Sequence, residues 1–251
     1  MAGSAAAMDA VIPVFEVEFT DRAGACCRGP LGELWSRPFE RAAPVRSFPS
    51  FRGQASFSGL YYAATMDTHV GFESWLERDV AMMLDFDPEV VAFSSQPFWL
   101  TWAQDGEQRR HAPDYFARLA DGTGVVIDVR PDDRIEPRDA EAFAATRRAC
   151  LAVGWVFRRT AGPGAVLAAN VRWLAGYRHR RCYRGDIAGM LTGVFAEPKP
   201  LMGGTREAGD PVAVLPVLYH LLWKQVLVTD MTAGLLGPVS LISVKQEGAD
   251  R

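Results

Sequence analysis

Apolar residues recur at helical spacing in two stretches of the chain. In residues 73–85 they fall near one helical stripe, and Asp87-Pro88 supplies a stop signal. Residues 138–154 begin behind Pro137 and end at Gly154, again with apolar residues at helical spacing. The pattern predicts two helices that each bury one face.

Between these stretches the chain has the pattern of strands. Runs of β-branched and aromatic residues cover 90–93, 96–102, 111–120 and 124–130, and a further run at 155–159 follows the second helix. Turns are predicted at 105–110 and at Asp121-Gly122. The order helix, strands, helix, strand predicts a mixed α/β fold built around one central sheet.

The ends of the chain have a different pattern. Residues 1–52, with one strand-like alternation at 15–20, are predicted to form a partly ordered N-terminal arm, and residues 53–162 to form the main domain. Residues 163–251 are predicted to form a C-terminal helical domain. In it, 164–193 is helical, 194–211 is a loop, and an apolar helix from Val212 and a final strand resemble a small winged-helix-like module.

Composition and charge narrow the class of protein. Of 251 residues, 49% are hydrophobic and 23% are charged, which excludes wholesale disorder, collagen and a coiled-coil rod. No secretory signal, membrane-spanning run or paired-cysteine motif is recognisable, so a cytoplasmic protein with no membrane partner is expected. The net charge of −3 conceals a balance of −7 over residues 73–135 and +7 over residues 136–184.

The acidic stretch contains the candidate chemistry. If the strands on either side of Asp121-Gly122 pair, residues whose numbers sum to about 243 face one another, and Asp114 lies near Asp128. Asp128 and Arg130 project from the same face of their strand. Glu73 and Glu77 share one face of the preceding helix, which could bring one of them to the two aspartates.

Three converging acids repel one another unless a cation lies between them. Hard oxygen ligands select Mg²⁺, with Mn²⁺ as a substitute. Such an ion lowers the pKa of a bound water, and a pair of ions about 3.5–4 Å apart stabilises the attacking and leaving oxygens of a phosphodiester. The cluster therefore predicts metal-dependent phosphodiester chemistry.

The same residues carry a family resemblance. Pro113-Asp114 followed by Asp128-x-Arg130 resembles the PD-(D/E)xK nuclease core. Residues 50–160, with the Gln96-Pro97 pair, are similar to the catalytic domain of TnsA-like transposase endonucleases, and the tail resembles that family's C-terminal domain loosely. The resemblance implies a restriction-endonuclease-like core with a small C-terminal helical or winged-helix-like module.

The resemblance also implies a function. It implies a Mg²⁺-dependent endonuclease subunit that cuts double-stranded DNA at the 5′ side of transposon ends, in a complex with a DDE transposase and an ATPase regulator. The metal ligands would be Glu77, Asp114 and Asp128, with Glu73 competing for the helical position, and Arg130 would be the terminal catalytic cation.

Arg130 departs from the family pattern, which has lysine at this position. Arginine stays protonated and cannot act as a base, although its guanidinium can stabilise a phosphate. Two alternatives therefore stay open. One is a catalytically weakened nuclease-fold subunit that binds DNA or supports assembly, and the other is a repair or defence nuclease on the same fold.

Other polar residues have both a functional and a structural interpretation. Gln96 is either a ligand on the metal side of the site or a structural residue before a proline, and His111 either contacts substrate or is structural. A final group of basic residues either forms a DNA-binding surface or the solvated face of a helix: Arg172, Arg178, Arg180, Arg181 and Arg184.

Overall fold

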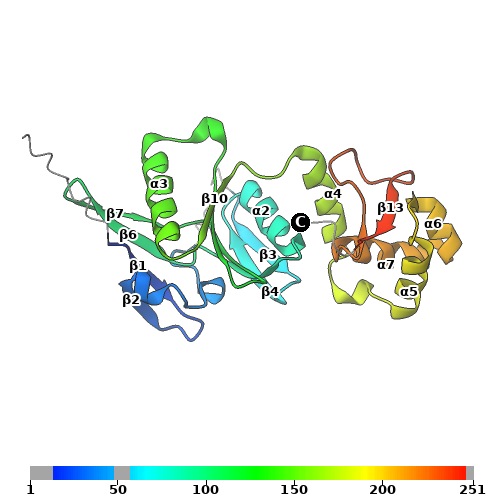
Figure 1. Cartoon of the computed structure of the whole chain (residues 1–251), viewed down its shortest axis with the longest axis horizontal. Helices are drawn as coiled ribbons and strands as arrows, with labels where there is room; N and C mark the ends of the chain where they lie inside the picture. Colours follow the sequence, from blue (N-terminus) through cyan, green and yellow to red (C-terminus); the bar gives the residue numbers. More distant parts are fainter. Residues whose placement is uncertain (1–13, 48–56, 247–251) are drawn as a thin grey trace, which may run out of the picture.

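The computed structural model of the protein describes residues 14–47 and 57–246. The chain folds into an elongated molecule with two groups of sheets and helices at one end and a helical group at the other (Figure 1). The strands are β1 (Glu16–Thr20), β2 (Cys26–Pro30), β3 (Gly59–Ala63), β4 (Thr68–Phe72), β5 (Val90–Ser95), β6 (Trp99–Gln104), β7 (Glu107–His111), β8 (Tyr115–Leu119), β9 (Gly124–Val129), β10 (Val156–Thr160), β11 (Lys199–Pro200), β12 (Leu227–Val228) and β13 (Leu241–Val244). The α-helices are α1 (Leu31–Leu34), α2 (Trp75–Phe86), α3 (Pro137–Ala152), α4 (Ala165–Ala175), α5 (Gly185–Val194), α6 (Leu201–Ala208) and α7 (Pro211–Trp223).

The central sheet has the strand order β10-β9-β8-β5, in which β10 and β9 are parallel and the other neighbours are antiparallel. Tyr115 lies opposite Ile127, so facing residues sum to 242, one less than predicted. The same register extended by one residue puts Asp114 directly opposite Asp128. The mixed α/β fold predicted from the sequence is confirmed, and it is consistent with a restriction-endonuclease-like core.

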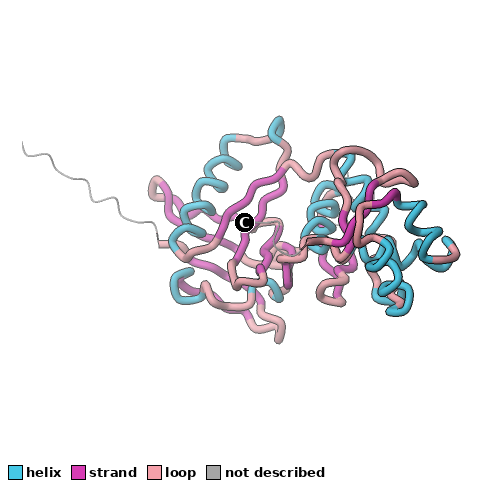
Figure 2. The backbone as a smooth tube through the Cα atoms, turned by 45° about the vertical axis from the view of Figure 1, so that its right-hand side comes forward, coloured by secondary structure: helices cyan, strands magenta, loops and turns pink. Residues whose placement is uncertain are grey.

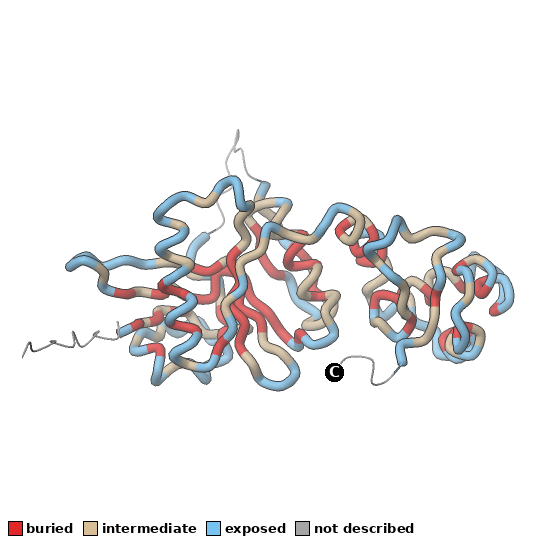
Figure 3. The backbone as a smooth tube through the Cα atoms, turned by 45° about the horizontal axis from the view of Figure 1, so that its top comes forward, coloured by how far each residue is buried: buried red, intermediate tan, exposed pale blue. Residues whose placement is uncertain are grey.

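The two faces of the central sheet pack into different cores. Tyr115 and Ile127 point into a core that α2 and the C-terminal helices complete. Phe116 and Val126 point the other way, into a core shared with α3 and the N-terminal strands. Figure 3 shows the buried positions concentrated along these central strands. Burial on both faces explains why the predicted strands lack a regular alternation of apolar and polar residues.

The N-terminal strands belong to a second sheet, of order β2-β1-β6-β7. Phe19 and Phe39 are buried within the core behind it, whereas residues 1–13 and 48–52 of the predicted arm lie outside the described residues. The turn predicted at 105–110 is shorter than expected, because the chain reverses at Asp105-Gly106, both with positive φ, and residues 107–111 form β7. The strand was missed because four of its five residues are exposed and polar.

The C-terminal region places four helices beside a three-stranded sheet of order β11-β13-β12 (Figure 2). The loop predicted at 194–211 is wrong, because residues 201–208 form α6. Gly204 in that helix is a packing requirement, since a Cβ there would lie 2.3 Å from the ring of Phe195. The winged-helix-like arrangement stays a prediction, and none of the described helices is long and apolar enough to cross a membrane.

Helix α2 packs against both the central sheet and the C-terminal helix α4. The residues that it buries differ from the apolar stripe predicted from the sequence. Trp75 is 51% exposed, whereas Asp79 and Asp85 are buried. Asp85 accepts hydrogen bonds from the Tyr61 hydroxyl at 2.9 Å and from two backbone amides, and Asp79 forms ion pairs with Arg78 and Arg172. Hydrophobic periodicity missed these acids because Arg172 and the segment at 61–65, which bind them, lie far away in the sequence.

Candidate active site

The first carboxylate of the candidate site, Glu77, is fixed by the N-terminus of α2. The Ser74 side chain accepts a hydrogen bond from the Glu77 backbone at 3.2 Å and donates one to Glu77 Oε1 at 2.9 Å. The backbone amide of Glu73 donates to Glu77 Oε2 at 2.7 Å. Ser74 is therefore the N-cap of α2, and the Glu77 carboxylate is oriented by the Ser74 hydroxyl and the Glu73 amide at the start of its own helix.

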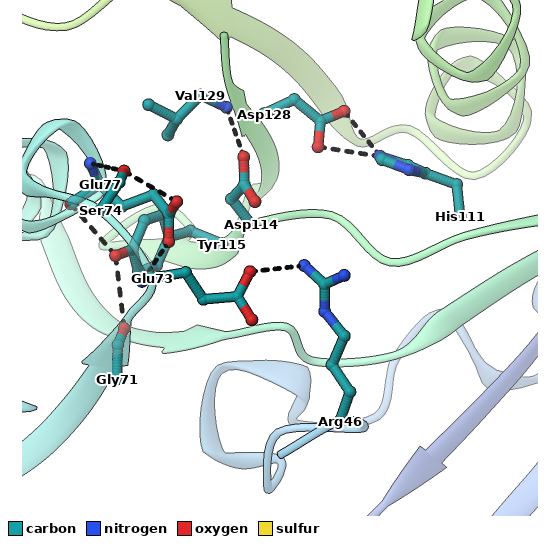
Figure 4. A network of polar contacts seen from close by, with 10 residues as sticks. All are labelled: Arg46, Gly71, Glu73, Ser74, Glu77, His111, Asp114, Tyr115, Asp128 and Val129. Carbon is teal, nitrogen blue, oxygen red and sulfur yellow. Dashed lines mark hydrogen bonds and ion pairs between the residues drawn. The ribbon is translucent and has the colours of Figure 1, made fainter. Parts of the chain in front are cut away.

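The register between β8 and β9 positions the other two acids. Asp114 immediately precedes β8, and its Oδ2 accepts a hydrogen bond from the Val129 backbone amide at 2.6 Å. Asp128 is 2% exposed, and its two carboxylate oxygens contact His111 Nε2 at 2.9 and 3.0 Å. Figure 4 shows Asp114 between the Glu73–Glu77 pair on one side and Asp128 with His111 on the other.

The electrostatics of this arrangement disfavour negative charge at its centre. Burial raises the pKa of Asp114 well above its ordinary value, and the nearby charges of Asp128 and Glu77 raise it further. Burial also raises the pKa of Glu77, although hydrogen bonds from Glu73 and Ser74 oppose that shift. The centre of the cluster is therefore a place where a proton or a cation would relieve repulsion.

An unpartnered amide lies next to this centre. Gln96 is 1% exposed, has a positive φ of 47°, and neither side-chain oxygen nor nitrogen has a hydrogen-bond partner in the described structure. Its backbone amide donates to the Asp114 carbonyl at 2.9 Å. An unsatisfied buried amide and a left-handed backbone at a non-glycine residue are both costly, and such costs cluster at functional sites.

The side chains of the site offer the type of ligand that a hard divalent cation prefers, but they are not arranged around one common ion position. Three carboxylates and one amide supply the oxygen ligands that Mg²⁺ or Mn²⁺ prefers. Among residues 14–47 and 57–246, however, no three acidic, histidine or cysteine side chains are arranged to hold a metal ion as they stand. Glu77, Asp114 and Asp128 each bind protein groups instead.

Arg130 is directed elsewhere. Its Nε and Nη2 donate to Asp139 Oδ2 at 3.0 and 2.7 Å, and Asp139 also accepts the Glu136 backbone amide at the start of α3. In the described structure no hydrogen bond or ion pair joins the Arg130 guanidinium to Glu77, Asp114 or Asp128. The structure thus gathers the predicted acids around Asp114 but pairs the predicted cation with α3.

The predicted DNA-binding arginines divide into two groups. Arg172 and Arg184 form ion pairs with Asp79 and Asp186, and Arg178 donates to the backbone carbonyls of Tyr62 and Ala175. Arg180 and Arg181 form no ion pair with an acid of the described chain and stay available.

Comparison with known families covers the central part of this site. Residues 87–160 match the family model described as TnsA-like endonuclease N terminal. This segment is similar to the N-terminal domain of TnsA-like endonucleases. It contains Gln96, His111, Asp114, Asp128 and Arg130, whereas α2 with Glu73 and Glu77 precedes the matched residues. A search of curated proteins finds no match.

Two residues close to the matched segment escaped prediction. Arg46 forms an ion pair with Glu73 at 3.0 Å, whereas Glu77 forms no ion pair in the described chain. No sequence signal links Arg46 to α2, because the pairing depends on how the N-terminal segment crosses the site. Ser74 could have been found, since the Ser-x-x-Glu spacing at 74–77 indicates a helix cap.

Proposed function

We propose that the protein is a Mg²⁺-dependent DNA endonuclease subunit of a heteromeric transposase, cutting phosphodiester bonds at the 5′ side of transposon ends. The observation that carries the proposal is the position of Asp114 between Glu77 and Asp128. Asp114 and Asp128 lie inside the segment that matches the TnsA-like endonuclease model, and Glu77 precedes it. A DDE transposase and an ATPase regulator are the proposed partners, by resemblance to the family.

Glu77, Asp114 and Asp128 would hold the metal ion, with Glu73 less suited because Arg46 already neutralises it. A bound Mg²⁺ would supply an activated water and charge neutralisation at the phosphate. His111 orients Asp128 by contacting both of its oxygens, and Ser74 and the Glu73 amide orient Glu77. The Gln96 amide has free donors and a free acceptor with which to orient a water or a phosphate oxygen.

A second candidate function is a weakened nuclease that binds DNA or supports assembly. The observation that favours it is the pairing of Arg130 with Asp139, which leaves the acids without the cation that nuclease cores of this kind place beside them. In that case the acids would be retained as scaffold, and the complex would cut DNA through another subunit.

The test is a nicking assay on end-containing DNA with the partner proteins and Mg²⁺ or Mn²⁺. The wild-type protein should nick the DNA, and Asp114→Asn should abolish nicking while DNA binding persists. Glu33→Gln is a suitable control, because this residue lies in α1 and takes no part in the site. Equal inactivity of wild type and Asp114→Asn in every partner combination would favour the scaffold function.

A further inference from the structure

A cavity of about 310 Å³ lies where β3 and the loop that follows it meet the C-terminal helices. None of the carboxylates of the candidate active site lines it. The titratable residues that line it are Tyr62, Asp67, Arg178, His179, Arg180, His220 and Lys224.

This cavity carries uncompensated positive charge. In the described structure, Arg178, Arg180 and Lys224 form no ion pair with any carboxylate, unlike the neighbouring Arg172 and Arg184. The single acid of the lining, Asp67, accepts the Tyr62 hydroxyl at 2.6 Å. The lining itself therefore has three permanent cations against one carboxylate, a surplus of two positive charges, and the buried Asp85 behind Ala64 binds the Tyr61 hydroxyl and the amides of Ala64 and Thr65.

One of the cations is held rigidly. Arg178 Nε donates to the Tyr62 carbonyl at 3.1 Å and Nη1 donates to the Ala175 carbonyl. Its guanidinium lies over the rings of Tyr61 and Tyr62, 5.1 and 5.5 Å from their centroids. These contacts leave Nη2 without a partner in the described chain, so a charged donor is fixed in place before any ligand arrives.

His179 adds a hydrogen-bond donor to the cavity, whereas the donor of His220 is already used within the chain. His179 Nδ1 accepts the Arg181 backbone amide at 3.1 Å, so its proton resides on Nε2. Buried His220 contacts the Tyr177 carbonyl through Nδ1 at 2.8 Å, which makes that nitrogen the donor. Burial lowers the pKa of His220, the hydrogen bond to the Tyr177 carbonyl raises it, and the nearby charge of Lys224 lowers it. A bound anion would relieve this crowding of positive charge.

We propose that this cavity binds a phosphate group. Two guanidinium groups, one ammonium and an imidazole N–H suit an oxyanion with several acceptor oxygens, and the surplus of two charges matches a phosphate dianion. The phosphate belongs either to a nucleic-acid backbone or to a small phosphorylated molecule. The backbone source rests on the proposed function, whereas the phosphate site itself does not.

The test uses the full chain with inorganic phosphate and pyrophosphate at constant ionic strength, without divalent ions. The ligands should raise the melting temperature and perturb the His179 and His220 ring resonances saturably. Arg180→Gln with Lys224→Gln should weaken binding about tenfold or more, because each removes an exposed charge-assisted donor. Asp67→Asn should tighten binding, since asparagine tolerates the positive φ of 52° at this position and removes the one opposing charge.

Arg181→Gln is the matched control. It removes the same charge from an adjacent exposed position that does not line the cavity, and phosphate binding should change less than about twofold. Absence of saturable binding in the wild type would overturn the proposal. An equal loss in Arg181→Gln and in the double variant would overturn it as well, because general charge would then explain the binding.

A second arm identifies the source of the phosphate. Binding of a short DNA duplex is measured against salt for the wild type and the double variant. A backbone phosphate predicts weaker binding and a salt slope smaller by about 0.9 for each lost contact. Unchanged DNA binding beside lost phosphate binding identifies a small phosphorylated ligand. Neither readout involves cleavage, so the phosphate site and the endonuclease function can fail independently.

Discussion

Replacing Asp114 with asparagine should stabilise the metal-free protein, and replacing it with alanine should not. Asparagine removes a carboxyl group whose charge is disfavoured by burial and by the charges of Asp128 and Glu77. Its side-chain oxygen can still accept the Val129 amide, which donates to Asp114 at 2.6 Å. The two variants therefore separate the electrostatic role of Asp114 from its role as a hydrogen-bond acceptor.

The size of the difference follows from that hydrogen bond. Alanine leaves the Val129 amide without its acceptor, and an unsatisfied buried donor costs about 1–3 kcal/mol. For a chain of this length, each kcal/mol corresponds to about 2–4 °C in melting temperature. We expect Asp114→Ala to melt about 2–12 °C below Asp114→Asn, with the wild type below Asp114→Asn.

Thermal unfolding in chelator and then in Mg²⁺ measures both effects. If the wild type binds the ion through Asp114, an ion concentration 100 times Kd adds about 2.7 kcal/mol to its stability, and Asp114→Asn gains far less. The stability order should then reverse between the two buffers. A wild type more stable than Asp114→Asn in chelator would refute the crowding of acids, and equal gains in Mg²⁺ would refute a metal bound through Asp114.

Three further predictions concern other residues. Gln96→Leu should raise stability by about 1–3 kcal/mol in thermal unfolding, because it removes an unpartnered buried amide. The same variant should nick DNA more slowly, and a loss of stability would show that the amide is satisfied. Arg130→Lys should lower stability by about 1 kcal/mol through the weakened pairing with Asp139, and a higher nicking rate would show that the native cation limits catalysis. Burial alone would raise the pKa of Asp79, but its ion pairs with Arg172 and Arg78 lower it below the ordinary value. The stability that this lowered pKa contributes is present above the unfolded-state pKa of about 4 and is lost as the pH falls through the lower folded-state value. The free energy of unfolding should therefore fall less steeply with decreasing pH in Asp79→Asn than in the wild type.

The central sheet and the acids on it could be predicted because their signals are local. The strand at 124–129 has the apolar β-branched run of a buried strand, and the turn residues at Asp121-Gly122 fix the register within one residue. That register is what brings Asp114 opposite Asp128. A short, strongly constrained hairpin therefore carries most of the predicted site.

The environment of those acids could not be predicted, because it depends on segments far apart in the sequence. The ion pair of Arg46 with Glu73 crosses 27 residues, and the contact of Arg172 with Asp79 crosses 93. Neither pairing has a periodicity or a motif, since a long charged side chain reaches partners on any nearby element. The structure places Glu77 and Asp128 near Asp114, and their role as a metal-binding cluster stays a prediction. Which of the acids would be neutralised was not deducible from the sequence.

Arg130 shows how this difference bears on function. From the strand pattern alone, Asp128 and Arg130 share one face and should meet the same ligand. Arg130 follows the last residue of β9, where the chain leaves the sheet toward α3, and its guanidinium satisfies Asp139 at the start of that helix. A substrate phosphate must therefore compete with Asp139 for the guanidinium before Arg130 can act. Asp139→Asn weakens that competitor while keeping an acceptor for the Glu136 amide, so a faster nicking rate in this variant would show that the helix cap restrains Arg130, and an unchanged rate would place Arg130 outside the reaction.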